Sequence, residues 1–188
     1  GGTSLQSSLL GNLSGVAGKI VAALGLFEIA KKFTELTSMA VDAYADYEQL
    51  TGGIETLYKD SADAVLANAQ QAFRTADMSA NEYMETVMQF SGSLLQSVGG
   101  DTVKAAQMAD MALRDMSDNA NKMGSSLESI TMAYQGFAKQ QYMLLDNLKL
   151  GYGGTKTEML RLVQEAVVVD KSVKSIDDVS FDQIIEGI

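Results

Sequence analysis

The stretch SANEYMETVMQFSGSLLQSVGGD, residues 79–101, decides the fold class of this chain. Ser79 and Glu82 form a predicted capping box, in which each side chain bonds a free backbone N–H at the start of a helix. A Gly-Gly pair closes the segment before Asp101, a favourable N-cap for a following helix. Apolar residues recur at helical spacing between these signals, at Tyr83, Val87, Phe90, Leu94 and Leu95. The stretch therefore predicts one complete amphipathic helix and the start of a second.

The same arrangement recurs along the chain. Capping boxes are also predicted at residues 125–128, 155–158 and 180–183, each followed by apolar residues at helical spacing. The chain has no proline, which removes the strongest helix breaker, and no strand pattern competes. We therefore expect an all-α, helical-bundle-like module of several amphipathic helices separated by Gly-rich breaks. The expected breaks are residues 51–53, 99–100 and 151–154.

Individual helix ends follow from the same signals. A helix capped by Asp60 or Ser61 is expected to run to about Phe73, with Phe73 facing inward. The helix after the box at 125–128 is expected to continue to about Leu148. The β-branched residues 167–169 are expected to fray the helix before them.

The N-terminal part of the chain predicts a long helix. Apolar residues keep helical spacing from Leu9 to Leu50, as one helix or as two joined near residues 28–32. Three segments are expected: a long Gly-containing amphipathic helix at 1–50, a helical module at 51–166, and a truncated C-terminal segment at 167–188. The chain begins Gly-Gly without Met, and we expect it to be a fragment of a longer protein.

A second stripe of small residues runs along the first helix. Each glycine lowers helix propensity by roughly 1 kcal/mol relative to alanine, and close approach of another helix would offset that loss. We therefore predict a helix-packing or oligomer seam. Its residues are Gly11, Gly15, Gly18, Ala22 and Gly25.

Composition excludes several kinds of chemistry. The 188 residues contain no His and no Cys, so Ser-His-Asp triads, Cys-His nucleophiles, thiolate or imidazole metal sites and disulfides cannot form within this chain. The net charge is −10, from 24 acidic and 14 basic residues, and no basic patch suits a phosphate backbone. We expect no cofactor, no metal, no direct nucleic-acid binding and no enzymatic activity.

Local patterns that suggest chemistry have simpler interpretations. The carboxylates Asp110, Asp115, Asp118 and Glu128 are interpreted as a solvated helix face rather than a glycosidase pair, and residues 115–124 lack the ligand spacing of a calcium loop. Residues 151–157 resemble a phosphate loop, but Thr155 separates the last glycine from the lysine, so a helix end followed by an N-cap is favoured. The paired methionines are interpreted as core residues, with an assembly surface as the alternative. They are Met84 with Met88 and Met108 with Met111.

From Ala43 to the C-terminus, the wording of the sequence resembles the tail tape-measure protein family of long-tailed bacteriophages and prophages. Several long words match in order, which makes the resemblance more specific than any single motif. The words are AYADYEQL at 43–50, TGGIETL at 51–57, SANEYME at 79–85, SLLQSVGGD at 93–101, MSDNANKMG at 116–124, AYQGFAK at 133–139 and DNLKLGYGGTKTE at 146–158.

The resemblance implies a structural role. Members of this family lie in the lumen of the growing tail tube, set its length, and leave ahead of the DNA at ejection. It implies other copies of the chain, the tail-tube protein, and tail-tip and tail-assembly chaperone proteins as partners. It places the chain in the virion tail lumen, and in the bacterial host cytoplasm during assembly.

A second function stays open, namely a membrane-active helical module that helps the genome cross the host envelope. Residues 13–30 are about long enough to span a bilayer, although Lys19 and Glu28 lie within them. Membrane insertion is the less favoured interpretation because a charge near the centre of a span costs about 3 kcal/mol.

Overall fold

A computed structural model of the chain describes residues 26–188, with side-chain surroundings from residue 31 onward. The chain divides into two compact units, residues 1–46 and 47–188, and each is considered by itself. Within the described residues every regular element is helical, which confirms the expected all-α class. The α-helices are α2 (Leu26–Tyr58), α3 (Ala62–Thr75), α4 (Ala80–Ser97), α5 (Thr102–Met123), α6 (Leu127–Ala138), α7 (Lys156–Glu165) and α8 (Phe181–Gly187). Short 3-10 helices lie at Lys59–Ser61, Leu145–Leu148 and Ile176–Asp178.

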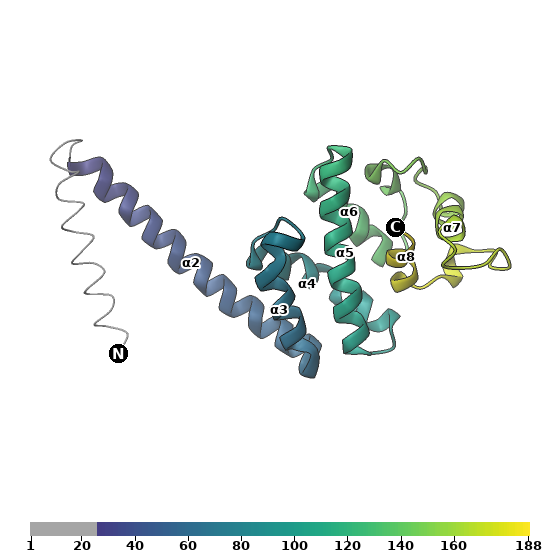
Figure 1. Ribbon diagram of the computed structural model, residues 1–188, viewed down its shortest axis with the longest axis horizontal. Helices are drawn as coiled ribbons and strands as arrows, with labels where there is room; N and C mark the ends of the chain where they lie inside the picture. The colour runs from purple at the N-terminus through teal and green to yellow at the C-terminus, as the bar shows by residue number, and fades with distance from the viewer. Residues whose placement is uncertain (1–25) are drawn as a thin grey trace. The chain divides into compact units, whose positions relative to one another are not determined.

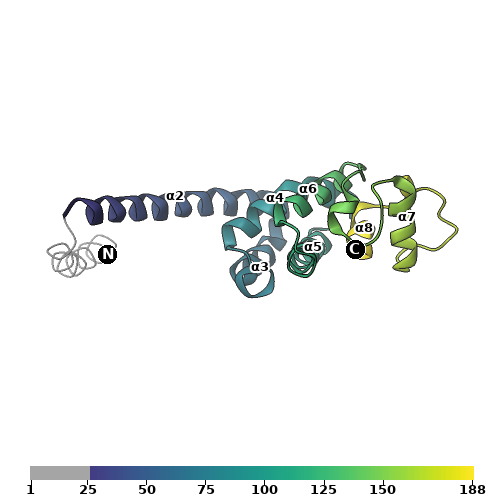
Figure 2. The same ribbon diagram turned by 90° about the horizontal axis from the view of Figure 1, so that it is seen from above.

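The second unit is a bundle with α4 near its centre (Figure 1). Helix α4 packs against α3, α5, α6 and α8, and α5 also contacts α3, α6 and α8. Seen from above, α4 and α6 lie in one layer over α3 and α5 (Figure 2). Helix α8 comes from the expected separate segment 167–188, yet Ile184 and Ile185 are buried in the common core.

The predicted break at residues 51–53 is wrong, because α2 runs through Gly52 and Gly53 to Tyr58. Glycine weakens a helix without ending it when tertiary packing supplies the stability. A Cβ at Gly53 would lie 2.8 Å from the terminal methyl of Met88 on α4. Gly53 therefore leaves room for the Met88 side chain and does not mark a turn.

Helix starts agree well with the sequence signals. The Ser79 hydroxyl accepts from the Glu82 N–H at 3.1 Å and the Glu82 carboxylate accepts from the Ser79 N–H, so this capping box is confirmed. Asp101 caps α5 by accepting from the Lys104 N–H at 3.0 Å. Thr155 caps α7. At α8, Gln183 Oε1 accepts from the Ser180 N–H at 3.1 Å, as the predicted box requires.

The capping box predicted at 125–128 is wrong, and a simple N-cap one residue later takes its place. Ser126, not Ser125, is the N-cap of α6, and its hydroxyl accepts from the Ser129 N–H at 3.2 Å. Ser125 instead donates to the Asn147 carbonyl at 3.3 Å. Either of the two adjacent serines could cap the helix, so the local sequence does not show which one does. The contact of Ser125 with Asn147 leaves Ser126 as the N-cap.

Two other local predictions are wrong. Helix α6 ends at Ala138 and not at Leu148, because the Gln141 N–H bonds back to the Gly136 carbonyl at 2.9 Å and turns the chain. Tyr142 and Leu145 are still buried, but from a turn and a 3-10 helix. Phe73 is 78% exposed on α3 rather than inward-facing, since the face that packs carries Val65, Ala69 and Ala72.

We predict opposite effects of alanine at two glycines of this unit. A Cβ at Gly154 would overlap the Met143 carbonyl, so Gly154→Ala must displace backbone and is expected to lower the free energy of unfolding by about 1–3 kcal/mol. Gly92 lies exposed within α4 with nothing near its Cβ position, so Gly92→Ala is expected to raise the free energy of unfolding by up to about 1 kcal/mol.

Urea unfolding followed by circular dichroism at the helical minimum measures both changes on the same scale. Equal effects of the two substitutions would show that the backbone of residues 151–154 is not held against Met143 as described.

Candidate functional site

An exposed apolar stripe on α2 is the first candidate for function. Apolar residues on α2 follow one another at alternating spacings of three and four, which is the heptad pattern of a helix-packing seam. We call this set of residues the α2 stripe. They are Phe33, Leu36, Ala40, Ala43, Tyr47, Leu50, Ile54 and Leu57. Every residue from 31 to 46 is exposed, including Phe33 at 40% and Leu36 at 65%.

The later half of the α2 stripe is core. Ile54 is fully buried, and Tyr47, Leu50 and Leu57 are partly buried against the bundle. Next to them, the buried Tyr58 hydroxyl lies 2.8 Å from Ser91 Oγ on α4. One continuous helix face is thus used for packing at one end and presents the same pattern to solvent at the other.

A buried carboxylate anchors α8 to the bundle. Asp182 Oδ1 accepts from the Ser97 hydroxyl at 2.6 Å, and Oδ2 accepts from Lys104 Nζ at 2.9 Å. The Asp182 N–H in turn donates to Ser97 Oγ at 2.9 Å. Burial alone would raise the pKa of Asp182, but hydrogen bonds from Ser180, Ser97 and Lys104 outweigh burial and lower the pKa.

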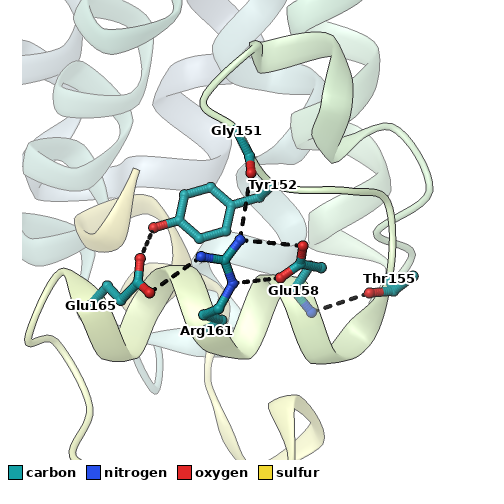
Figure 3. Close-up of polar contacts among 6 residues, drawn as sticks. All are labelled: Gly151, Tyr152, Thr155, Glu158, Arg161 and Glu165. Carbon is teal, nitrogen blue, oxygen red and sulfur yellow. Dashed lines mark hydrogen bonds and ion pairs between the residues drawn. The ribbon is translucent and has the colours of Figure 1, made fainter.

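A cluster around Arg161 closes the turn before α7 (Figure 3). The guanidinium bonds Glu158 through Nε at 2.6 Å and Glu165 through Nη1 at 3.2 Å, and it lies over the Tyr152 ring at 4.2 Å from the centroid. The Tyr152 hydroxyl donates to the Glu165 carboxylate. Hydrogen bonding to Arg161 is the main reason that the pKa of Glu158 is lowered. Because these partners already satisfy one another, the cluster is a structural clasp.

The structure also shows the conformation of residues 151–157, which resemble a phosphate loop in sequence. Thr155 Oγ1 accepts from the Glu158 N–H at 3.1 Å, so the turn 151–154 leads into an N-cap, as the sequence analysis favoured. Lys156 Nζ lies 2.9 Å from Asp177 Oδ1 and is occupied by that ion pair.

The four acidic residues considered as a catalytic pair lie in different surroundings. Asp118 and Glu128 are exposed, as expected for a solvated face. For Asp110 that interpretation is wrong: its carboxylate accepts from the Tyr83 hydroxyl at 2.8 Å and pairs with Arg114 at 2.8 Å. Burial, together with nearby Asp118, raises the pKa of Asp115. Between residues 26 and 188, no group of three or more acidic residues is placed to hold a metal ion.

The methionines divide between core and surface. Met84 and Met108 are buried, as the core interpretation predicts. Met88 is partly buried against the core, whereas Met111 is 41% exposed on α5.

The predicted small-residue seam lies outside the described residues. This applies to Gly11, Gly15, Gly18, Ala22 and Gly25, and the seam stays a prediction. In the described part of the chain, no helix combines the length and apolar character that crossing a bilayer requires.

Sequence reasoning missed the contacts of Asp182 and Arg161. The spacing of Glu158, Arg161 and Glu165 is typical of ion pairs along one helix face, so this signal could have predicted the two ion pairs of Arg161. No local signal connects Asp182 to Ser97, which lies 85 residues earlier in the chain.

Comparison of the chain with protein-family models, with curated proteins and with solved structures found no match.

We predict that Asp182→Asn lowers the free energy of unfolding by about 1–2 kcal/mol at neutral pH, because charge-assisted hydrogen bonds are lost. The folded-state pKa of Asp182 lies below its unfolded value, so its contribution is present at neutral pH and is lost as pH falls through the folded-state pKa. The difference between parent and variant should therefore shrink in acid.

Denaturant unfolding at pH 7 and pH 3 measures this dependence. Lys104→Met is the matched variant. It removes the ion pair with Asp182 and leaves the hydrogen bonds between Asp182 and Ser97, so it isolates the contribution of the ion pair. A stability difference for Asp182→Asn that is the same at both pH values would contradict the role of the carboxylate.

Proposed function

We propose that the chain is an all-α segment of a phage tail tape-measure protein, acting as scaffold and length determinant. The single observation that carries the proposal is the ordered set of words from Ala43 to Glu158. The geometry is compatible with it, since α2 is a 33-residue helix whose residues 31–46 are exposed. The proposed location is the tail lumen in the virion and the host cytoplasm during assembly.

A helix can measure length because its rise per residue is fixed at about 1.5 Å. Helix α2, with 33 residues, would contribute about 50 Å by this rule. The bundle of residues 47–188 differs, because its helices fold back on one another and its span does not grow with residue number. In this proposal α2 is the measuring element and the bundle is a folded module of the ruler.

The charge suits the proposed surroundings. A net charge of −10 disfavours binding to the DNA that follows the chain through the tube. The proposed partners are other copies of the chain, the tail-tube protein, and tail-tip and tail-assembly chaperone proteins.

We predict that inserting extra heptads into α2 lengthens the tail in proportion. Copies of residues 33–39 placed after Met39 keep the α2 stripe in register, and ten copies should add about 105 Å at about 1.5 Å per residue. Five copies should add half as much. Electron microscopy of tails from the phage that encodes the chain measures the change.

The control insertion places the same number of Gly and Ser residues after Lys171, an exposed position in the bundle. It adds mass without extending a helix, so tail length should not change. If both insertions lengthen the tail equally, or if neither changes its length, α2 is not a measuring element.

The proposed homo-oligomer would form through the exposed half of the α2 stripe. A heptad seam hides its apolar residues by packing against another helix, and each buried leucine contributes about 1.5–3 kcal/mol. Residues 33–43 carry that pattern in exposed positions.

We predict that Leu36→Glu weakens self-association by about tenfold or more, because it places a charge in the seam. Val41→Glu is the matched control: Val41 is 62% exposed against 65% for Leu36, but it lies about 100° around the helix from the stripe. Sedimentation equilibrium measures the association constant of each variant. If both substitutions weaken association equally, the stripe is not the seam.

A further inference from the structure

A groove runs between α4 and α6 and continues to the turn that follows α6. Its two sections have free volumes of about 380 Å³ and 260 Å³ and share Met132 and Gln135 in their walls. Across the groove, Gln135 Nε2 donates to Gln89 Oε1 at 2.6 Å and ties the two helices together. The groove is therefore a continuous surface feature built on rigid elements.

One end of the groove is acidic. Glu82, Glu85 and Glu128 line it and are exposed. Among the described residues, no lysine or arginine forms an ion pair with any of these three carboxylates. The only basic residue lining either section is Lys139, which lies at the opposite end. Glu82 accepts from the Ser79 N–H, but in the described part of the chain no basic side chain pairs with the acidic end.

The other end of the groove exposes two methionines among the polar side chains of Gln135, Lys139 and Gln141. Met132 is 51% exposed where the two sections meet, and Met143 is 78% exposed beside Leu144 at the far end. Methionine side chains are flexible and polarizable, so they fit partners of varied shape. An acidic end followed by exposed methionines matches an amphipathic ligand with a basic end.

We propose that this groove binds a basic amphipathic helix of a partner protein. Lysine or arginine residues of that helix would lie beside Glu82, Glu85 and Glu128, and its apolar face would cover Met132 and Met143. The span from Glu128 to Lys139 is eleven residues, about 16 Å of helix, which matches three turns of a ligand helix. Binding of an amphipathic helix in a groove through spaced apolar anchors is a common recognition mode.

A synthetic peptide tests the proposal on the chain itself. The probe is a fluorescein-labelled 14-residue helix with two lysines in its first turn and leucines along one face, and its partner carries glutamates in place of the lysines. Fluorescence anisotropy at low salt measures the dissociation constants. We expect saturable binding of the lysine peptide and about fivefold or weaker binding of the glutamate peptide.

Two variants and a control locate the binding. Glu85→Lys and Met132→Glu, both at exposed positions, should each weaken binding of the lysine peptide about fivefold while circular dichroism stays unchanged. Asp118→Lys makes the same charge change on exposed α5 outside the groove and should leave binding intact.

Three results would overturn the proposal. The first is equal affinity for the two peptides. The second is a loss of lysine-peptide binding with Asp118→Lys that equals the loss with Glu85→Lys. The third is self-association of the chain that Met132→Glu abolishes, which would assign the groove to a second copy. The assay needs no tail, so its outcome is separate from that of the proposed length-determining function.

Discussion

Burial of the apolar face of α4 is the constraint on which the structure of residues 47–188 depends. Helices α3, α5, α6 and α8 all reach the core by packing on α4. The Phe90 ring on α4 meets Phe181 of α8 edge to face, with centroids 6.1 Å apart, which joins the middle of the chain to its C-terminal helix. Each large apolar side chain buried this way contributes about 1.5–3 kcal/mol. The polar contacts of Asp182 then fix the position at which α8 packs.

The sequence predicts those features of the fold that depend on interactions between residues close together in the chain. The all-α class and most helix starts follow from residues three apart, as Ser79 with Glu82 shows, because a cap is satisfied within one turn. Helix ends were predicted less well. Helix α2 passes through Gly53 because tertiary packing supports it, and α6 stops at Ala138 because the Gln141 N–H bonds back to the Gly136 carbonyl, a turn that the apolar spacing does not reveal.

The candidate sites divide in the same way. The exposed α2 stripe was readable from spacing, but which half of it is buried depends on the bundle, as Ile54 illustrates. The acidic end of the groove arises only when α4 and α6 pack together, so that Glu85 and Glu128 line one groove from positions more than 40 residues apart. No pattern within either helix indicates that juxtaposition.

The continuity of α2 has a mechanical consequence. Helix α2 continues past residue 46 without a loop, so tension along the chain is carried by the helix backbone to Ile54 and Tyr58. Apolar packing there, with the contact between Tyr58 and Ser91, resists the load. When that packing yields, each residue can lengthen from about 1.5 Å in a helix to about 3.4 Å in an extended chain. The bundle is therefore a reserve of contour length that becomes available when its packing yields.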